Sequence, residues 1–67
     1  MNGLLSPNSK PSKHKVGDTI QTSEGKGQII HVAFDRIYRN EWTYDIYLHN
    51  PTNGRTYYKW FWESELE

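Results

Sequence analysis

Three histidines are the side chains of this chain best suited to metal binding or to general acid–base catalysis. His14 lies in a polar N-terminal stretch, His31 lies in an apolar run, and His49 comes directly before residues 50–54. None of them forms the His-x-His or Glu-x-x-His spacing that brings two ligands to one metal ion. The chain has no cysteine, which excludes zinc–thiolate sites and cysteine nucleophiles. The residues therefore predict that the protein is not an enzyme and has no metal, no cofactor and no small-molecule substrate.

The aromatic residues are better suited to binding than any other group in the chain. Three Trp, five Tyr and two Phe residues all lie between Phe34 and Trp62. Basic residues are interleaved with them, namely Arg36, Arg39, Arg55 and Lys59. Exposed Tyr, Trp and Arg side chains contribute strongly to protein interfaces, and aromatic rings stack on nucleic-acid bases. A carboxylate beside such rings, here Glu41 or Asp45, would also suit a methyl-ammonium cage. The combination predicts a contact surface for another macromolecule.

Short alternating segments indicate that strands position these residues. Apolar and polar residues alternate around Ile20 and along residues 42–49, whereas no segment repeats with the 3.6-residue period of a helix. Gly25-Lys26-Gly27 could cradle a phosphate through its amides, but a strand rather than a helix follows it, so a hairpin turn is favoured. The expected strands are residues 18–22, 28–36, 42–49 and 55–62, with turns at 23–27, 38–41 and 50–54 and a 3₁₀ turn with a stub of strand at the C-terminal end.

The pairing of the last two expected strands decides which rings point outward. A five-residue loop, residues 50–54, places Tyr47 opposite Tyr57 and Asp45 opposite Lys59, because side chains alternate between the two faces. The inward set on this pairing is Ile30, Val32, Phe34, Trp42, Tyr44, Ile46, Leu48, Tyr58, Trp60 and Trp62. The partner-binding residues predicted from the outward set and its flanks are Tyr38, Arg39, Tyr47, Arg55, Tyr57, Lys59 and Phe61.

A known family shares this order of elements. The residues that carry the likeness are Val16-Gly17-Asp18, Gly25-Lys26-Gly27-Gln28-Ile29, Tyr44-Asp45-Ile46 and Trp62-Glu63-Ser64-Glu65-Leu66. Over residues 15–67 the pattern resembles the SH3-like small β-barrels, which include the Tudor, KOW and CarD-type modules. The resemblance implies an all-β, five-stranded SH3-like small barrel. It also implies a binding or docking module rather than a catalyst, with protein or RNA partners.

The N-terminal stretch differs in composition from the rest of the chain. Residues 1–14 are rich in Ser, Asn, Lys and Pro, and their one apolar patch, Leu4-Leu5, is too short for a signal peptide or a membrane span. We therefore expect a disordered N-terminal arm at 1–14, a folded domain at 15–67, no membrane contact and a soluble cytoplasmic protein. Lysines in this arm could contact phosphates, although a solubilising role is favoured.

Charge balance favours one class of partner over the other. The chain has eight Lys and Arg residues and eight Asp and Glu residues, so its net charge is zero. A nucleic-acid binder usually shows an excess of basic residues. We therefore predict a non-enzymatic protein-binding module that docks on a larger protein or assembly. The alternatives are a nucleic-acid-binding accessory protein, for RNA or DNA, that uses the same surface, and self-association through an edge strand.

Overall fold

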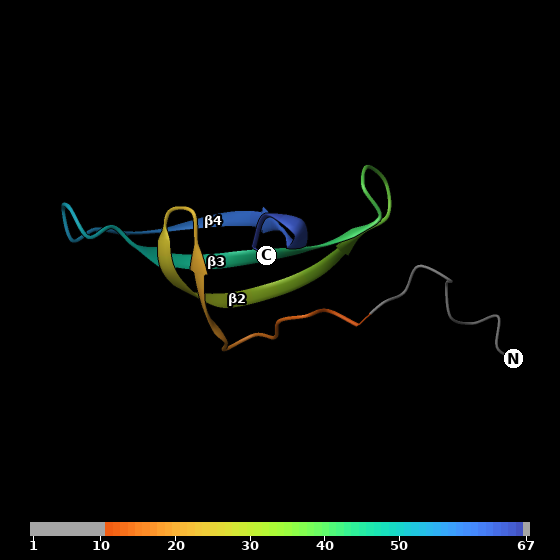
Figure 1. The fold of residues 1–67 in the computed structure, drawn as a ribbon, viewed down its shortest axis with the longest axis horizontal. Coiled ribbons are helices and arrows are strands. Elements are labelled where there is room, and N and C mark those ends of the chain that lie inside the picture. The colour runs from red at the N-terminus through yellow and green to blue at the C-terminus, as the bar shows by residue number, and fades with distance from the viewer. Residues whose placement is uncertain (1–10, 67) are drawn as a thin grey trace, which may run out of the picture.

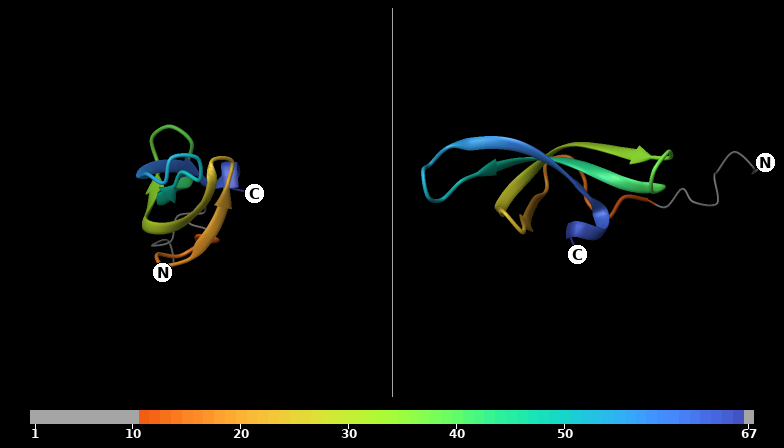
Figure 2. Two further views of the ribbon diagram at one scale, coloured as in Figure 1. Left: turned by 90° about the vertical axis from the view of Figure 1, so that its left-hand side faces the viewer. Right: turned by 90° about the horizontal axis from the view of Figure 1, so that it is seen from above.

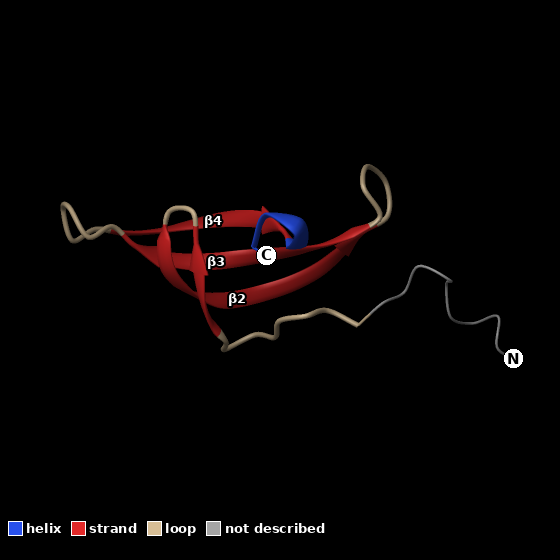
Figure 3. Cartoon of the chain, viewed as in Figure 1, coloured by secondary structure: helices blue, strands red, loops and turns tan. Residues whose placement is uncertain are grey.

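The computed structural model describes residues 11–66, which form one open antiparallel sheet followed by a 3₁₀ turn (Figures 1 and 3). The strands lie in the sheet in the order in which they occur along the chain. Their bounds are β1 Thr19–Thr22, β2 Gly25–Asp35, β3 Glu41–His49 and β4 Thr56–Trp62, and the turn η1 spans Glu63–Leu66. The prediction of an all-β domain is confirmed. Residues 1–10 of the expected N-terminal arm lie outside the described residues.

The C-terminal end differs from the expected fifth strand. Residues 63–66 form the predicted 3₁₀ turn, and within residues 11–66 no strand follows it. The sheet therefore has β1 and β4 as its two edges. In Figure 2, the β1–β2 hairpin and η1 lie on the same side of the long strands, and η1 contacts β1, β3 and β4. This side of the curved sheet is called the concave face below.

The core lies on the concave face. Its buried side chains come from three strands and are Ile29, Tyr44, Ile46, Leu48 and Phe61. Ile20 from β1 and Leu66 from η1 pack against them from the other side. Burial of these apolar side chains is the main stabilising contribution in a sheet that has water on its other face. The predicted inward direction of Tyr44, Ile46 and Leu48 is confirmed.

Residues 13–14 extend this packing toward β3 and η1. The backbone amide of Lys13 and the Tyr44 hydroxyl both donate to Oε2 of Glu63, at 3.0 and 2.6 Å. The amide of His14 donates to the Tyr44 oxygen at 3.4 Å. Burial and the Glu63 carboxylate together raise the pKa of Tyr44 to about 12. The buried hydroxyl therefore stays protonated well above its ordinary range and keeps donating to Glu63.

A bulge in β2 changes which of its residues face the core. Ile29 lies opposite Ile46 and His31 lies opposite Asp45, so Ile30 is an extra residue between them. Ile29 is buried, whereas Ile30 is 42% exposed. The predicted inward direction of Ile30 is therefore wrong. After the bulge, Val32 lies opposite Tyr44 and packs against the core as predicted.

The pairing of β3 with β4 also differs from the prediction by one residue. The amide of Asn50 donates to the Arg55 carbonyl at 2.7 Å, so these two residues extend the ladder and the connection contains residues 51–54. Gly54 has a φ of 72° in this turn. An even number of loop residues pairs Tyr47 with Tyr58 instead of with Tyr57. Because a shift of one residue exchanges the two faces of a strand, every side chain of β4 points to the face opposite to the predicted one.

Candidate functional site

The convex face of the sheet carries a group of exposed aromatic side chains. Paired residues of β3 and β4 point to the same side, and the convex pairs are Thr43 with Trp62, Asp45 with Trp60, and Tyr47 with Tyr58. Ile30 joins them from the bulge of β2, beside Tyr58 and Trp60. We call Ile30, Asp45, Tyr47, Tyr58, Trp60 and Trp62 the aromatic face.

Large apolar side chains on this face are exposed to water. Tyr58 is 67% exposed, Trp60 is 54% exposed and Tyr47 is 37% exposed. The solvent face of an antiparallel sheet normally carries polar residues, so these contiguous apolar groups make this face the candidate binding surface.

Ring contacts hold these side chains in defined positions. The Tyr47 and Tyr58 rings have their centroids 5.0 Å apart with a tilt of 50°. Trp60 and Trp62 form an edge-to-face pair with centroids 5.2 Å apart. The Arg39 guanidinium lies over the Trp62 ring, 4.5 Å from its centroid. Such contacts reduce the side-chain entropy that a partner must remove on binding.

Two shallow grooves run along the aromatic face. One has a volume of about 410 Å³ and is lined by Ile30, Asp45, Tyr58, Lys59 and Trp60. The second has a volume of about 390 Å³ and is lined by Ala33, Phe34, Asp35, Tyr38, Thr43, Asp45, Trp60 and Trp62. Asp45 and Trp60 line both grooves and therefore lie between them. A protruding side chain of a partner could enter either groove and contact the Trp60 ring.

The loop between β2 and β3 contributes Tyr38 to the lining of the second groove. Asp35 accepts the amides of Tyr38 and Arg39 at 3.0 and 2.8 Å, and Asn40 ends the turn with a φ of 55°. The amide of Arg39 is the main cause that holds the pKa of Asp35 below its usual range. These contacts fix the backbone at Tyr38, whose side chain lines the groove and is 84% exposed.

A single carboxylate lies at the centre of the aromatic face. The Oδ2 atom of Asp45 is 3.6 Å from Nδ1 of His31, and its side chain is 50% exposed. Lys59 lines the first groove beside Asp45, but its ammonium binds Glu24 of the β1–β2 hairpin. The centre of the face therefore carries a carboxylate, whereas the guanidinium of Arg39 lies at its margin over Trp62.

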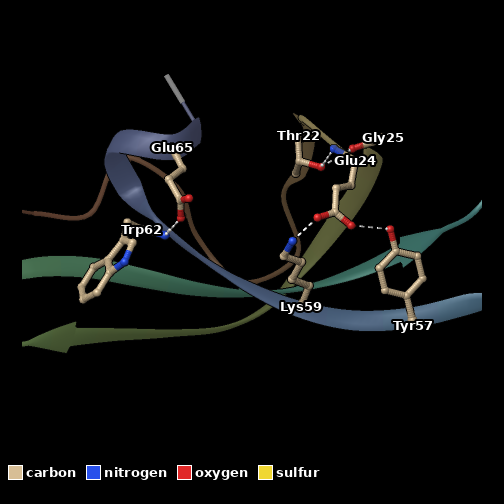
Figure 4. A network of polar contacts seen from close by, with 7 residues as sticks. All are labelled: Thr22, Glu24, Gly25, Tyr57, Lys59, Trp62 and Glu65. Carbon is tan, nitrogen blue, oxygen red and sulfur yellow. Dashed lines mark hydrogen bonds and ion pairs between the residues drawn. The ribbon is translucent and has the colours of Figure 1, made fainter.

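Glu24 connects the β1–β2 hairpin to the concave side of β4 (Figure 4). Its Oε1 atom accepts the Tyr57 hydroxyl at 3.0 Å, and its Oε2 atom accepts the Lys59 ammonium. Within the two-residue turn, the amide of Glu24 donates to Oγ1 of Thr22, which in turn donates to the carbonyl of Gly25. These contacts hold the Tyr57 hydroxyl and the Lys59 ammonium at the β1–β2 hairpin, on the side opposite to the aromatic face.

The Glu24 contacts predict a loss of stability in acid. Lys59, and secondly Tyr57, hold the pKa of Glu24 below its usual value of 4.5. A carboxyl whose pKa is lowered by folding stabilises the fold above its unfolded pKa and loses that contribution as the pH falls through its folded pKa. Urea unfolding between about pH 6 and about pH 3 should therefore show a smaller acid-induced loss in Glu24→Gln than in the wild type. Equal losses in both proteins would contradict this role of Glu24.

The structure brings only some of the predicted binding residues to one surface. Tyr38, Arg39 and Tyr47 lie at or beside the aromatic face. Arg55 is exposed at the end of the β3–β4 hairpin. Tyr57 and Lys59 lie on the concave face with Glu24, and Phe61 is 3% exposed in the core. The predicted outward direction of Tyr57, Lys59 and Phe61 is therefore wrong, because the true pairing of β4 is shifted by one residue.

The convex face also carries side chains whose predicted inward direction is wrong. Tyr58 and Trp60 were expected in the core and lie on the convex face, together with the half-buried Trp62. The signal that could have located them is the length of the loop after His49, which differs by one residue between the two pairings. Composition alone carries no such information, since both faces of β4 are aromatic.

Other kinds of site find no support in the described part of the chain. Residues 11–66 contain no group of three or more His, Asp or Glu side chains placed to hold a metal ion. Among the same residues, no helix has the length and apolar character needed to cross a membrane. Comparisons with known proteins found no matching family model, no similar curated protein and no similar solved structure. The residues and geometry of this chain are therefore the basis on which its function is inferred.

Proposed function

We propose that this chain is a non-enzymatic binding module that docks on a protein partner through the aromatic face. The observation that carries the proposal is the exposure of Tyr58 and Trp60 on the same side of the sheet as Tyr47. Rigid, amphipathic rings of this kind are the residue types that dominate binding energy at protein interfaces. Trp60 lines two grooves, and side chains of the partner would bind in them.

Charge favours a protein over a nucleic acid as the partner. A phosphate backbone binds where Lys and Arg side chains gather, and its affinity depends on the number of phosphates neutralised. Here a carboxylate, Asp45, lies between the two grooves, and the ammonium of Lys59, which lines the first groove, is already bound by Glu24. The zero net charge adds no long-range attraction to an anion.

The proposal includes membership of the SH3-like small-barrel class, whose members act mainly as docking modules. Its support is the meander of four strands, the 3₁₀ turn after the last of them and the contact of that turn with β1. Closure into a barrel would require the two free edges, those of β1 and β4, to be joined directly or through a further strand.

Substitution of Trp60 by alanine should abolish docking without unfolding the protein. A central exposed Trp at an interface typically contributes 2 kcal/mol or more, so we expect the affinity for the partner to fall by roughly thirtyfold or more. The measurement is recovery of a stoichiometric protein from source-cell extract on immobilised wild type and variants. Circular dichroism of each variant checks that the fold is retained.

Val16→Ala is the matched control, because Val16 is 63% exposed and lines neither groove. The proposal requires that the partner is retained by this variant and lost by both Trp60→Ala and Tyr58→Ala. Retention by all three variants would exclude the aromatic face as the docking surface. A labelled oligonucleotide that binds at about 50 mM salt and dissociates by about 200 mM would instead assign the face to nucleic acid.

A further inference from the structure

The outer edge of β4 is the longest unpaired strand edge in residues 11–66. β4 pairs with β3 on one side and is the last strand of the sheet, whereas the opposite edge, β1, has only four residues. The seven residues of β4 contain no proline or glycine, and their ladder with β3 runs without a bulge. An edge of this length presents a row of amides and carbonyls to which another strand can pair.

The hydrogen-bond pattern of the hairpin defines which backbone groups face this edge. Asn50 and Arg55 form a hydrogen-bonded pair, and such pairs alternate along an antiparallel ladder. The backbone groups of residues 57, 59 and 61 therefore face β3, and those of residues 56, 58, 60 and 62 face outward. An independent contact agrees with this assignment, because the amide of Trp62 donates to Oε1 of Glu65 at 2.8 Å, outside the ladder (Figure 4).

The usual protection of an edge strand is missing from β4. Proteins guard exposed edges with proline, bulges or lysines whose charge repels an incoming strand. The single charged residue of β4 is Lys59, and its ammonium is bound by Glu24 on the concave face. Glu65 covers the edge only at its end, at Trp62. Within the described part of the chain, the amides of Tyr58 and Trp60 are left open to a second strand.

We infer that this edge is where a second copy of the chain binds, so that two β4 strands pair antiparallel and form one continuous sheet. With Tyr58 opposite Tyr58 of the second copy, Thr56 pairs with Trp60 of that copy, and the outward backbone groups at these positions bond reciprocally. On the concave side, Tyr57 then faces Lys59 of the other copy, so the two lysines do not oppose each other. The zero net charge of the chain removes long-range repulsion between the copies.

This inference does not rest on the proposed docking function. The docking surface consists of side chains on the convex face, whereas the dimer is held by backbone groups at the edge. The two aromatic faces would join across the new strand pair, with two Tyr47–Tyr58 pairs side by side. Loss of the protein partner and loss of the dimer can therefore be measured separately.

Sedimentation equilibrium over a wide concentration range tests the inference on the whole chain. We expect a mass that rises from 8.0 kDa to twice that value as the concentration increases. Tyr58→Pro removes the outward amide at the centre of the pairing and leaves the ladder to β3 intact, since proline is tolerated where its nitrogen faces solvent. Two lost amide–carbonyl bonds should weaken the dimer roughly tenfold to a hundredfold. Tyr58→Ala, which keeps the amide, is the matched control and should weaken it less.

Hydrogen exchange of the wild type gives a second readout that needs no variant. The amides of Tyr58 and Trp60 should become protected as the concentration rises, whereas the amide of Lys59, which faces β3, should be protected at all concentrations. A monomer at every concentration would overturn the inference. A dimer in which the amides of Tyr58 and Trp60 exchange freely would also overturn it, because the copies would then associate elsewhere.

Discussion

Replacement of Phe61 by alanine should remove a large part of the free energy of unfolding, whereas replacement of its neighbour Trp60 should leave most of it. Phe61 is 3% exposed and belongs to the core cluster. Removal of a buried Phe ring costs about 3–5 kcal/mol. For a folded unit of this size the total stability is on the order of 3–8 kcal/mol, so the loss is a large part of it.

Trp60→Ala is the control for this prediction, because the two residues are adjacent and of similar character. Trp60 is 54% exposed and contacts the Trp62 ring on the convex face, so its removal should cost about 1 kcal/mol or less. Urea unfolding followed by circular dichroism measures both variants. The reverse order of stabilities would show that β4 has the opposite face in the core, and the aromatic face would then consist of other residues.

Substitution of Gly27 by alanine is expected to have the second large effect on stability. A Cβ at this position would lie 2.5 Å from Cγ2 of Ile46, 2.7 Å from the Tyr47 carbonyl oxygen and 2.8 Å from Cδ2 of Leu48. Two of these groups are buried core side chains and the third is backbone, so none can move aside without disturbing the sheet. Overpacking of this kind costs about 1–3 kcal/mol or more. Thermal unfolding should show a clear fall in the midpoint.

Gly54→Asn provides a matched comparison at a glycine of another kind. Gly54 has a φ of 72°, and nothing lies within 4 Å of the position of an added Cβ. Asparagine adopts this left-handed conformation more readily than other non-glycine residues, so its cost should stay within a few tenths of a kcal/mol to about 1 kcal/mol. If Gly27→Ala were no less stable than Gly54→Asn, the close approach of β2 to β3 at this position would be contradicted.

The buried and exposed faces of the central strand, β3, could be predicted from the sequence, because its apolar and polar residues alternate without interruption. Residues 42–49 alternate between large apolar and polar side chains, and the structure buries Tyr44, Ile46 and Leu48 as expected. The 3₁₀ turn was also expected at its observed place. In these segments the local pattern and the burial requirement agree, so only one assignment of faces is possible.

The last strand could not be assigned in the same way. Residues 57–62 are aromatic at five of six positions, so both faces offer apolar surface to the core. The decision then depends on whether four or five residues connect β3 to β4. The pairing of Asn50 with Arg55 settles this in the structure, supported by Asn50 and Asn53 side chains that accept the amides of Thr52 and Arg55.

The bulge in β2 and the Glu24 contacts are also beyond the reach of sequence patterns. Ile29 and Ile30 are both isoleucines, so the sequence does not show which of them is buried. The pairing of β2 with β3 decides it, because the bulge directs Ile29 into the core. Glu24 lies 33 and 35 residues from Tyr57 and Lys59, and these residues meet only because the β1–β2 hairpin lies over the concave side of β4. Long-range contacts of this kind follow from the fold and in turn determine which residues are left for a partner.

Cross-strand nuclear Overhauser effects between α-protons test the outward direction of Tyr58 and Trp60 most directly. In an antiparallel pair, the α-protons of directly opposite residues approach closely at the positions that do not exchange hydrogen bonds. The pairing described above predicts strong effects between Tyr47 and Tyr58 and between Asp45 and Trp60. Effects between Tyr47 and Tyr57 would instead place Tyr58 and Trp60 in the core, so the aromatic face would not exist and their amides would not face the free edge of β4.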